Sequence, residues 1–515
     1  MNSTDKRFLN EIKERIHSFV SKDSQLYSKI QHPIDQEVVD KLDRINLASG
    51  DEFELFQFAD DIKKLWKLLI KKSIICLRYF DNREPFQACE NKKPIAYGIN
   101  ELGKYFERYS EFEQLLYGGV KYYRDHVIHV FRVWMLGVNI LLDPKYNYLD
   151  EIVIEKGFEV NSLEKLSIWT IISLTHDLGY PLEKSIQIID KTKVMMNSFV
   201  QNPIVTMDTS FSGVQNSMND YVLKFMSSKM NGIEKDNPHK RICFDEDEYR
   251  KILQDPDKTK LEDYKKEKNY VARLQPKYYF KFQKSLEHNS HGVLSALIIY
   301  KLLIYFLESD FSTNEDYIFD HEDARQFYIR REILRSIASH TCHDVYQNSM
   351  LSFSFLLILC DDAQEWGRKS IAELYVSKNN DYEYHSIAIK LDNNPFICTF
   401  SDKYKIEEYD SAKIILENFL RQSNTYVCVF RDGQDTKSRN FNFVKQTKIE
   451  VEEGPEKKLY YIRLEVTADQ QARIILNSEQ NSDFEENDSL VNIFKEVFKT
   501  IIYEDQNTII HELCL

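Results

Sequence analysis

The stretch SIWTIISLTHDLGYP (167–181) decides the fold of this chain. Its first half is almost entirely apolar or small, so it predicts a helix that is buried in the protein core. The apolar run ends on His176-Asp177, and two polar groups at such a position are costly to bury without a strong partner. Gly179-Tyr180-Pro181 then predicts a break in the helix. We therefore expect a functional pair of residues at the end of a central helix.

Segments on both sides of this stretch repeat apolar residues at three- and four-residue steps, which predicts further helices. In chain order the predicted helices cover 53–77, 116–145, 163–185, 291–309, 331–343 and 354–374. After about residue 375, β-branched and aromatic residues alternate or cluster between turn residues, which predicts strands. These strands cover 384–392, 395–402, 425–430 and 457–467, and a last helix is expected at 490–504.

The fold class that follows is mainly α, with three expected parts. Residues 1–115 form an N-terminal helical region, 116–375 form the core domain, and 376–515 form a smaller C-terminal α+β domain. The core domain contains a polar insertion at about 200–285. Its charged run DEDEYRKILQDPDKTKLEDYKKEK (245–268) indicates a solvated helix or a mobile insertion.

Charge and composition exclude several classes of function. The chain has 68 basic and 82 acidic side chains among 515 residues, so its net charge is −14. This balance disfavours binding to long nucleic acids, but metal ions can still attract a small phosphate ligand locally. Eight scattered cysteines without a CxxC pair predict reduced thiols in the cytoplasm. The N-terminus does not resemble a signal peptide, and no run reaches the ~18 apolar residues of a membrane span.

Histidines gather at the ends and on the faces of the predicted central helices, namely at positions 126, 129, 176, 288, 291, 340 and 343. A single histidine on an apolar helix is more often a core residue than a metal ligand. The joint pattern is different, because Asp177 and Asp361 also follow apolar runs. Imidazole and carboxylate groups without cysteine suit one or two divalent ions of Mn, Mg, Fe, Co or Zn.

The order H…HD…H…H…D resembles the HD-domain superfamily of metal-dependent phosphohydrolases over about residues 120–370. The likeness rests on HVFRV (129–133), on the doublet, and on the aspartate in LILCDD (357–362). It implies an HD-type helical bundle in which four core residues bind metal: His129, His176, Asp177 and Asp361. In members that hold two ions, further histidines are added, here matching His291 and His340.

Neighbouring residues compete for several of these positions. His126 competes with His129, His288 with His291, His343 with His340, and Asp362 with Asp361. The second member of each pair is a candidate proton donor or a supporting residue, or else a polar surface residue. As candidate catalytic groups we select Asp177, His126 and His291.

The substrate class also follows from the resemblance. HDLGYP (176–181) and HGVLSA (291–296) are similar to motifs of dNTP triphosphohydrolases, although Tyr180 stands where that branch usually has a histidine. The additional His340 is instead typical of two-metal phosphodiesterases that cleave cyclic nucleotides. We expect a phosphohydrolase that cleaves a phosphate ester or anhydride of a nucleotide with metal-activated water. The preferred substrate is a (deoxy)nucleoside triphosphate, and a cyclic (oligo)nucleotide is the alternative. A silent HD module that only binds nucleotides or acts as a scaffold is the alternative from another class.

Candidate substrate contacts flank the motifs: Arg124, Arg132, Lys184 and Arg368 could clamp phosphate or form surface ion pairs. The segment QPKYYFKFQK (275–284) offers Tyr278, Tyr279 and Lys281 for stacking a base and holding phosphates. The competing interpretation is an element that covers the core. The C-terminal domain has no phosphate loop, and it could mediate homo-oligomerisation or bind an effector nucleotide or a protein partner.

Overall fold

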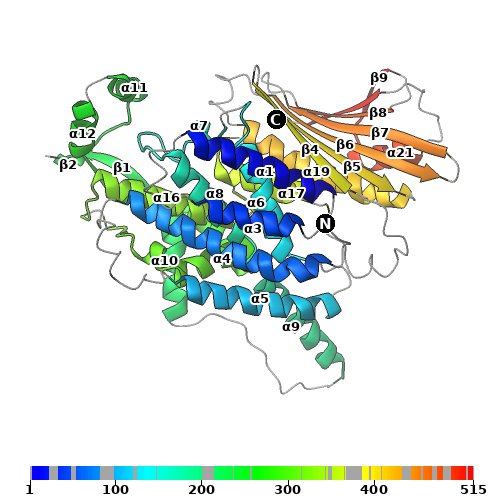
Figure 1. The fold of residues 1–515 in the computed structure, drawn as a ribbon, viewed down its shortest axis with the longest axis horizontal. Helices are drawn as coiled ribbons and strands as arrows, with labels where there is room; N and C mark the ends of the chain where they lie inside the picture. The colour runs from blue at the N-terminus through cyan, green and yellow to red at the C-terminus, as the bar shows by residue number, and fades with distance from the viewer. Residues whose placement is uncertain are drawn as a thin grey trace.

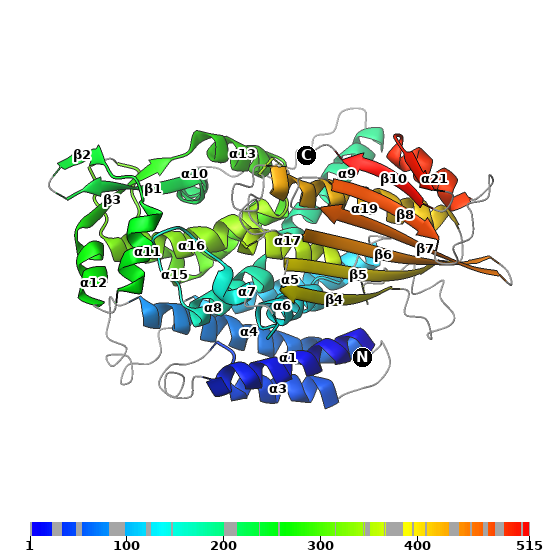
Figure 2. The same cartoon turned by 90° about the horizontal axis from the view of Figure 1, so that it is seen from above.

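The computed structural model describes residues 3–22, 33–47, 54–81, 98–119, 125–145, 148–199, 214–235, 237–255, 258–314, 316–342, 344–345, 351–364, 366, 385–393, 396–406, 409–431, 442–453, 456–466, 472–478, 489–505 and 508–513. Helices dominate this part of the chain, which confirms a mainly α fold. A large helical body lies beside a sheet formed by the C-terminal part of the chain (Figures 1 and 2).

The first half of the chain is helical. Its helices are α1 (Ser3–Lys22), α3 (Gln36–Leu47), α4 (Glu54–Phe80), α5 (Ile99–Gly119), α6 (Val127–Leu141), α7 (Tyr148–Glu151), α8 (Ser162–Thr175) and α9 (Tyr180–Phe199). One predicted helix is therefore divided in two, and a second is interrupted where the sequence predicts a break. The segment predicted at 116–145 is split between α5 and α6, and Asp125 accepts hydrogen bonds from the first amides of α6. The segment predicted at 163–185 is interrupted by a turn after α8.

Helix α8 runs through the centre of the body, and every residue from Leu163 to Thr175 is buried. Asn161 begins it with a capping box to Glu164, which satisfies the free amides of the first turn. The buried hydroxyl groups of this helix donate hydrogen bonds to backbone carbonyls one turn earlier, as Thr170 does to Leu166 at 2.8 Å. Burial therefore leaves these donors satisfied. A helix that is buried on all sides explains why the apolar run carries no polar face.

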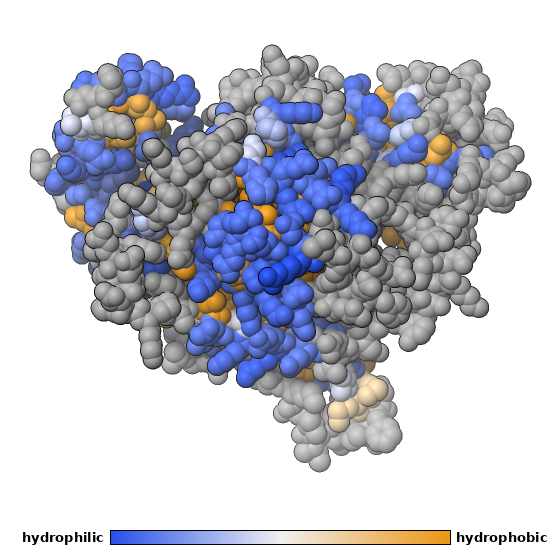
Figure 3. Space-filling view, in the orientation of Figure 1, coloured by the Kyte–Doolittle hydropathy of each residue, from blue (hydrophilic) through white to orange (hydrophobic). Residues whose placement is uncertain are grey.

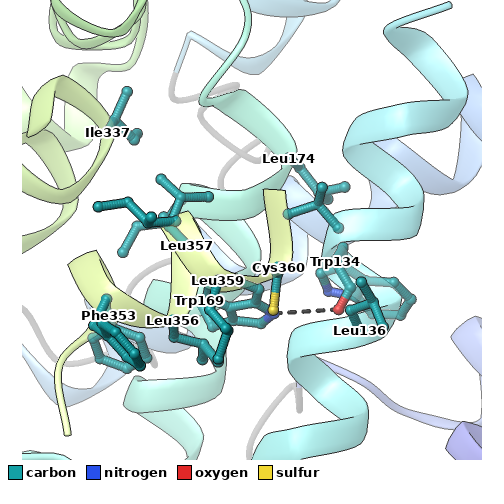
Figure 4. Packing of buried hydrophobic residues seen from close by; sticks show 14 of the residues in the cluster. Trp134, Leu136, Trp169, Leu174, Ile337, Phe353, Leu356, Leu357, Leu359 and Cys360 are labelled. Atoms are coloured by element: carbon teal, nitrogen blue, oxygen red, sulfur yellow. Dashed lines mark hydrogen bonds between the residues drawn. The ribbon is translucent and has the colours of Figure 1, made fainter. Parts of the chain in front are cut away.

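The packing of α6 against α8 depends on two tryptophans and one glycine (Figure 4). Trp169 donates a 3.2 Å hydrogen bond from Nε1 to the carbonyl of Trp134, and both rings are fully buried. A Cβ atom at Gly137 would lie 1.9 Å from the Trp169 ring, so glycine is needed for this close approach. Leu356 and Cys360 of α17 (Phe353–Ala363) close the same cluster.

The polar insertion is ordered in its described part. It consists of α10 (Val214–Ser227), β1 (Ser228–Glu234), β2 (Asn237–Arg241), α11 (Glu246–Gln254), α12 (Lys258–Lys266), β3 (Lys268–Leu274) and α13 (Pro276–Glu287). Its three strands form an antiparallel sheet in the order β2-β1-β3. The charged run forms α11 and α12, largely exposed helices as the sequence predicts, and α13 returns the chain to the core.

The remaining helices of the body are α14 (His291–Leu302), α15 (Ile304–Leu307), α16 (His321–Ser339) and α17. The predicted helices at 291–309 and 331–343 correspond to α14 with α15 and to the second half of α16. Helix α17 corresponds to the beginning of the helix predicted at 354–374, whose last residues lie outside the described part of the chain.

A seven-stranded sheet follows, in the order β4-β5-β6-β7-β8-β10-β9. The strands are β4 (His385–Asn393), β5 (Phe396–Ile406), β6 (Asn442–Glu453), β7 (Glu456–Val466), β8 (Ala472–Ser478), β9 (Ile502–Asp505) and β10 (Thr508–Leu513). All neighbouring strands are antiparallel except β5 and β6, which are joined by the crossover helix α19 (Tyr409–Arg431). Helix α21 (Ser489–Phe498) packs beside α19.

Two predictions for this region were wrong in part. Residues 425–430 (TYVCVF) form the end of α19 and not a strand. The buried positions Leu416, Phe419 and Tyr426 follow a helical spacing, and this longer pattern outweighs the β propensity of the last turn. The helix predicted at 490–504 ends at Phe498, and its last residues form β9.

The sheet region touches the helical body at the end of α17. Gln422 donates from Nε2 to the carbonyl of Asp362 at 3.2 Å, and the Tyr426 hydroxyl donates to the Asp362 carboxylate at 3.4 Å. Within the described residues, no helix is long and apolar enough to cross a membrane. The described surface on the face in Figure 3 is mostly hydrophilic with scattered apolar positions.

Candidate metal centre

The six residues that the sequence predicts as metal ligands come together, although they belong to five helices. We call this set the metal centre: His129, His176, Asp177, His291, His340 and Asp361. Nearly all of them lie at helix ends. His176 and His340 are the C-caps of α8 and α16, and His291 is the first residue of α14. Polar side chains can point into a shared interior space at such ends without breaking an apolar helix face.

Two glycines allow the helix ends to approach each other. A Cβ atom at Gly179 would lie 2.4 Å from the carbonyl oxygen of His291, so only glycine lets the turn after the doublet contact α14. A Cβ atom at Gly292 would lie 2.7 Å from the carbonyl oxygen of Ile337 and 3.0 Å from Nδ1 of His340. These contacts bring His291 and His340 close to Asp177.

One side of the metal centre is formed by two imidazoles and Asp361. Nε2 of His129 lies 2.9 Å from Oδ1 of Asp361, and Nε2 of His176 lies 3.7 Å from the same oxygen. Oδ2 of Asp177 faces the same two imidazoles, at 3.6 Å from His129 and 3.5 Å from His176. Four ligand atoms therefore surround one point, which we call the first subsite.

The other side of Asp177 faces a second pair of imidazoles. Its Oδ1 atom lies 3.3 Å from Nε2 of His291 and 3.7 Å from Nε2 of His340. The two Nε2 atoms of that pair are 3.3 Å apart. This is the second subsite, and the carboxylate of Asp177 lies between the two subsites with one oxygen toward each.

The protonation of all four imidazoles is set by their outer contacts. Nδ1 of His176 lies 2.8 Å from the carbonyl of Ser173, and Nδ1 of His340 lies 2.6 Å from the carbonyl of Ile337. A carbonyl can only accept, so both Nδ1 atoms carry a proton, and both Nε2 atoms face the interior, where a neutral ring presents a lone pair.

The other two imidazoles have the same arrangement. Nδ1 of His129 donates to Oε1 of Gln364 at 2.5 Å, and the amide of Gln364 is oriented because its Nε2 donates to the carbonyl of Trp366. Nδ1 of His291 lies 2.6 Å from Glu183, which also accepts the backbone N–H of His291 at 3.1 Å. All four Nε2 atoms thus point inward.

Several nitrogen atoms crowd together inside the metal centre. Nε2 of His176 is buried and has no hydrogen-bond partner among the described residues, and Nε2 of His291 faces Nε2 of His340. The ligand atoms of His129, His176 and Asp361 lie within 4.8 Å of one another, as do those of His176, Asp177 and His340. Converging nitrogen lone pairs and carboxylate oxygens fit a divalent cation, so these clusters could hold a metal ion.

The electrostatics of the metal centre point the same way. Burial by itself lowers the pKa of His176, but the carboxylates of Asp177 and Asp361 outweigh burial and raise that pKa to about 9. Burial also opposes ionisation of Asp177 and Asp361, yet the surrounding imidazoles hold both pKa values well below their usual range. The carboxylates therefore stay ionised, and the site attracts positive charge, either as a proton or as a metal ion.

The open side of the metal centre is at Asp361 and His291. Their side chains are 30% and 20% exposed, whereas those of His129 and His176 are at most 1% exposed. A substrate would approach from this side. Glu183, half-buried behind His291, has its pKa lowered to about 2, because its bonds to His291 and Lys184 outweigh the effect of burial.

The competing residues occupy other positions. Asp362 faces away toward α19, where Arg421 and Tyr426 contact its carboxylate. His126 stacks on Tyr180 at 3.9 Å between ring centroids and is 3.4 Å from Glu113. It lies next to the metal centre, 6.1 Å from His129 between ring centroids. Its role as a proton donor stays a prediction. His288 is the C-cap of α13, and His343 lies outside the described residues.

The predicted substrate contacts are only partly at the site. Arg124 and Arg368 lie outside the described residues. Lys184 lies beside the metal centre, with Nζ 3.2 Å from Glu183 and 4.8 Å from the centroid of the Tyr180 ring. The prediction for Arg132 was wrong, since its guanidinium is 2% exposed and donates to Asp5 and to the carbonyl of Trp366.

The residues of segment 275–284 that were predicted to bind substrate contact residues outside the metal centre. It forms α13, so the competing interpretation of a helix that covers the core is correct. The Tyr279 hydroxyl donates to Asp220 at 2.6 Å, and Lys281 donates to the carbonyl of Asp344. Tyr278 lies under the guanidinium of Arg335.

Three supporting residues were missed by the sequence analysis: Glu183, Gln364 and Asp5. Glu183 is one turn into α9 and reads as a surface residue in the sequence, and Gln364 follows the second aspartate of α17 without a recognisable motif. Their partners are 108 and 235 residues away in the chain. The one sequence signal for Glu183 is its position six residues after Asp177, close to the His176-Asp177 doublet.

Comparisons with protein-family models, with curated proteins and with solved structures found no match for this chain. A functional assignment therefore depends on the geometry and chemistry of the metal centre itself.

Proposed function

We propose that this chain is a divalent-metal-dependent phosphohydrolase of the HD type that acts on a nucleotide. One observation carries the proposal: Asp177 presents one oxygen to each of two pairs of imidazoles whose Nδ1 protons are all engaged elsewhere. Packing alone does not explain this arrangement, because bringing so many buried polar atoms together costs free energy unless a ligand such as a cation binds them.

The donor set selects the class of cation. Among the described residues, the metal centre offers imidazole nitrogens and carboxylate oxygens, which suit Mn²⁺, Fe²⁺, Co²⁺, Zn²⁺ or Mg²⁺. His129, His176, Asp177 and Asp361 would hold the first ion, and His291, His340 and Asp177 would hold a second one. When bound, such ions stabilise negative charge on phosphoryl oxygens and lower the pKa of a bound water.

The residues of the chain would contribute orientation and charge. Asp177 is the group best placed to accept a proton from an attacking water, because its two oxygens face both subsites and it stays ionised. Glu183 holds the ring of His291 by two contacts, so that imidazole keeps one orientation toward the open side. Lys184 places a positive charge beside this opening, where the phosphates of a substrate would lie.

We place a (deoxy)nucleoside triphosphate first as the substrate, with hydrolysis that releases triphosphate or pyrophosphate. A cyclic (oligo)nucleotide is the second candidate, and one observation favours it. The pair His291 and His340 creates a second subsite next to Asp177, and two ions on one bridging carboxylate suit the cleavage of a phosphodiester. A silent nucleotide-binding module is the candidate from another class.

Metal analysis combined with a substrate panel tests these proposals. The purified full chain should contain one to two divalent ions, and Mn²⁺ should raise the melting temperature of protein treated with chelator. The panel comprises dNTPs, NTPs, cyclic mononucleotides, cyclic dinucleotides and bis-p-nitrophenyl phosphate, each with Mn²⁺, Mg²⁺ and Co²⁺, with products identified by mass. Metal binding without turnover of any member would support the silent module. Absence of both metal and a thermal shift would contradict the metal centre.

A further inference from the structure

A second group of polar residues lies on α16, away from the metal centre. Arg335 is half-buried, and its guanidinium lies over the ring of Tyr278 on α13 with Cζ 3.9 Å from the ring centroid. Lys277 approaches the same ring, with Nζ 4.9 Å from the centroid. No carboxylate of the described residues forms an ion pair with Arg335, although arginine carries five donors that normally find acceptors.

A further arginine increases this excess of positive charge. Arg331 precedes Arg335 by one helical turn and is 5% exposed. It bonds to the carbonyl of Ser228 at 3.2 Å and lies 3.5 Å from Glu155, but its buried Nε atom has no hydrogen-bond partner in the part of the chain that the structure describes. Like charges at this spacing on a helix repel each other.

Two acids lie near these arginines. Glu155 is engaged with Arg331, and the buried Glu332 has its pKa raised, because burial outweighs the two arginines near it. Burial and Arg331 lower the pKa of Arg335 to about 10, and they outweigh Tyr278 and Glu332, which favour its charged form. A buried cation without a direct ion pair is costly and is usually matched by an anion.

We propose that Lys277, Tyr278 and Arg335 form a binding site for a small phosphate-bearing anion, which we call the arginine site, and that Arg331 one turn away adds to its positive charge. A guanidinium presents paired donors whose spacing matches that of phosphate oxygens. The ring of Tyr278 packs against the guanidinium of Arg335 and fixes its orientation. Lys277 is exposed at the edge of α13, so an anion can reach the site from solvent.

The arginine site is distinct from the metal centre. Arg335 and His340 are five residues apart on α16, which corresponds to about 7.5 Å along the helix and about 140° around it. The two side chains therefore leave α16 on different sides, and a phosphate at the metal centre would not be the one bound by Arg335. The site would take an effector, and it does not depend on the proposed phosphohydrolase activity.

Calorimetry on the full chain tests the arginine site, with metal removed by a chelator so that the metal centre does not bind phosphate through an ion. The probes are inorganic phosphate, pyrophosphate, AMP and ATP at constant ionic strength. We expect saturable binding, and Arg335→Met should weaken it at least ten-fold. The matched control is Arg273→Met, an exposed arginine on β3 of the same insertion, which should change the affinity less than two-fold. Equal affinity for phosphate and AMP would identify free phosphate as the ligand, and tighter binding of AMP or ATP would identify a nucleotide.

Thermal unfolding without anion separates a binding role from a structural one. Arg335→Met removes an unmatched charge but keeps the packing on Tyr278, so its melting temperature should equal or exceed that of the wild type. Lys277→Met, at an exposed position that cannot disturb the core, should also weaken binding by about three-fold, a modest loss for one solvent-exposed charge. The proposal is overturned if no probe binds the wild type saturably, or if both variants bind like the control. It is also overturned if Arg335→Met melts lower and phosphate stabilises it as much as the wild type.

Discussion

Asp5 on α1 accepts a 2.9 Å hydrogen bond from Nε1 of Trp366, a residue 361 positions later in the chain. The carbonyl of Trp366 in turn accepts from Nε2 of Gln364 at 2.8 Å, and Oε1 of Gln364 accepts the Nδ1 proton of His129. Arg132 closes the network through two bonds to Asp5 and one to the Trp366 carbonyl. The N-terminal helix is therefore connected to His129 of the metal centre by buried hydrogen bonds.

This network predicts that Asp5→Asn affects both stability and metal binding. The change leaves the buried Arg132 without its counter-charge, so the free energy of unfolding should fall by about 3 kcal/mol. Mn²⁺ affinity should also fall, because a displaced Trp366 no longer orients Gln364 and His129. Urea unfolding and titration with Mn²⁺ measure the two effects.

The control for Asp5 is Asp43→Asn. Asp43 pairs with Lys13 at 2.9 Å, but its side chain is 48% exposed, so the loss should stay below about 0.5 kcal/mol. Equal stability losses for the two variants would show that the buried network contributes no more than a surface ion pair.

Asp177 is the residue on which the proposed chemistry depends most. Asp177→Asn keeps the size of the side chain and one coordinating oxygen, but it removes the charge that faces both subsites. Metal affinity should therefore fall. Turnover should fall further, on the order of 10²-fold or more, as is usual when a general base or a bridging ligand is lost. Kinetics on the substrate found by the panel, with metal content measured in parallel, check both effects.

Asp362→Asn is the matched control for that variant. Asp362 follows a metal-centre residue directly, but its carboxylate faces Arg421 and Tyr426 on α19. Metal content and turnover should stay within about two-fold of the wild type, since surface pairs of this kind contribute little. Full turnover by Asp177→Asn would mean that the doublet is structural and would refute the proposed mechanism.

Gly292 gives a prediction about the second subsite. In Gly292→Ala the new methyl group would overlap the Thr341 hydroxyl and the carbonyl of Ile337, so α14 must move away from the end of α16. His291 and His340 would separate, and the number of bound Mn²⁺ ions should fall while the first subsite stays occupied. Such overpacking should also cost about 1–3 kcal/mol of stability. Elemental analysis and urea unfolding measure these changes.

Gly232→Ala serves as the comparison, because a Cβ atom there meets only ordinary contacts, the nearest at 3.4 Å. It should leave the metal content unchanged. If Gly292→Ala binds as many ions as the wild type, the close approach of α14 to α16 is not what forms the second subsite.

Much of the metal centre could be predicted from the sequence, for a physical reason. A histidine or an aspartate at the end of an apolar helix stands out, and His176, Asp177 and Asp361 all have this setting. The order H…HD…H…H…D then predicted His129, His291 and His340 as further members of the site. Whether these residues bind metal stays a prediction, as do the expected domain boundaries.

The sequence could not predict contacts between residues that are far apart in the chain and lie in no recognisable motif. Glu183 reads as one acid in a solvated helix, and its bond to His291 depends on how α9 and α14 meet. Arg132 was misjudged for the same reason, because its partner Asp5 lies in a helix whose packing no local pattern reveals. The last turn of α19 was misjudged because β-branched residues dominate a short window, whereas the helical spacing is visible only over the whole element.

His321, far from the metal centre, gives a pH prediction. Its ring stacks on Phe158, its Nδ1 lies 3.1 Å from the Tyr270 hydroxyl, and its buried Nε2 has no hydrogen-bond partner within the described residues. Burial, with a contribution from nearby cations, lowers its pKa to about 4, whereas the value in an unfolded chain is about 6.5. Below pH 6.5 the unfolded chain takes up a proton that the folded protein refuses. This contribution to stability is therefore complete above pH 6.5 and is lost as the pH falls toward 4.

The loss between pH 7 and pH 5 should be about 2 kcal/mol for this group. Many other groups titrate in that range, so the test is the difference between the wild type and His321→Gln, measured by urea unfolding at both pH values. The variant cannot take up the proton, so it should gain about 2 kcal/mol relative to the wild type on going to pH 5. Asn10→Gln, at an exposed position on α1 that carries no titratable group, should show a difference from the wild type that does not change with pH. A pH-independent difference for His321→Gln as well would mean that the folded protein accepts the proton at His321, and that the buried contacts of this ring do not oppose its charge.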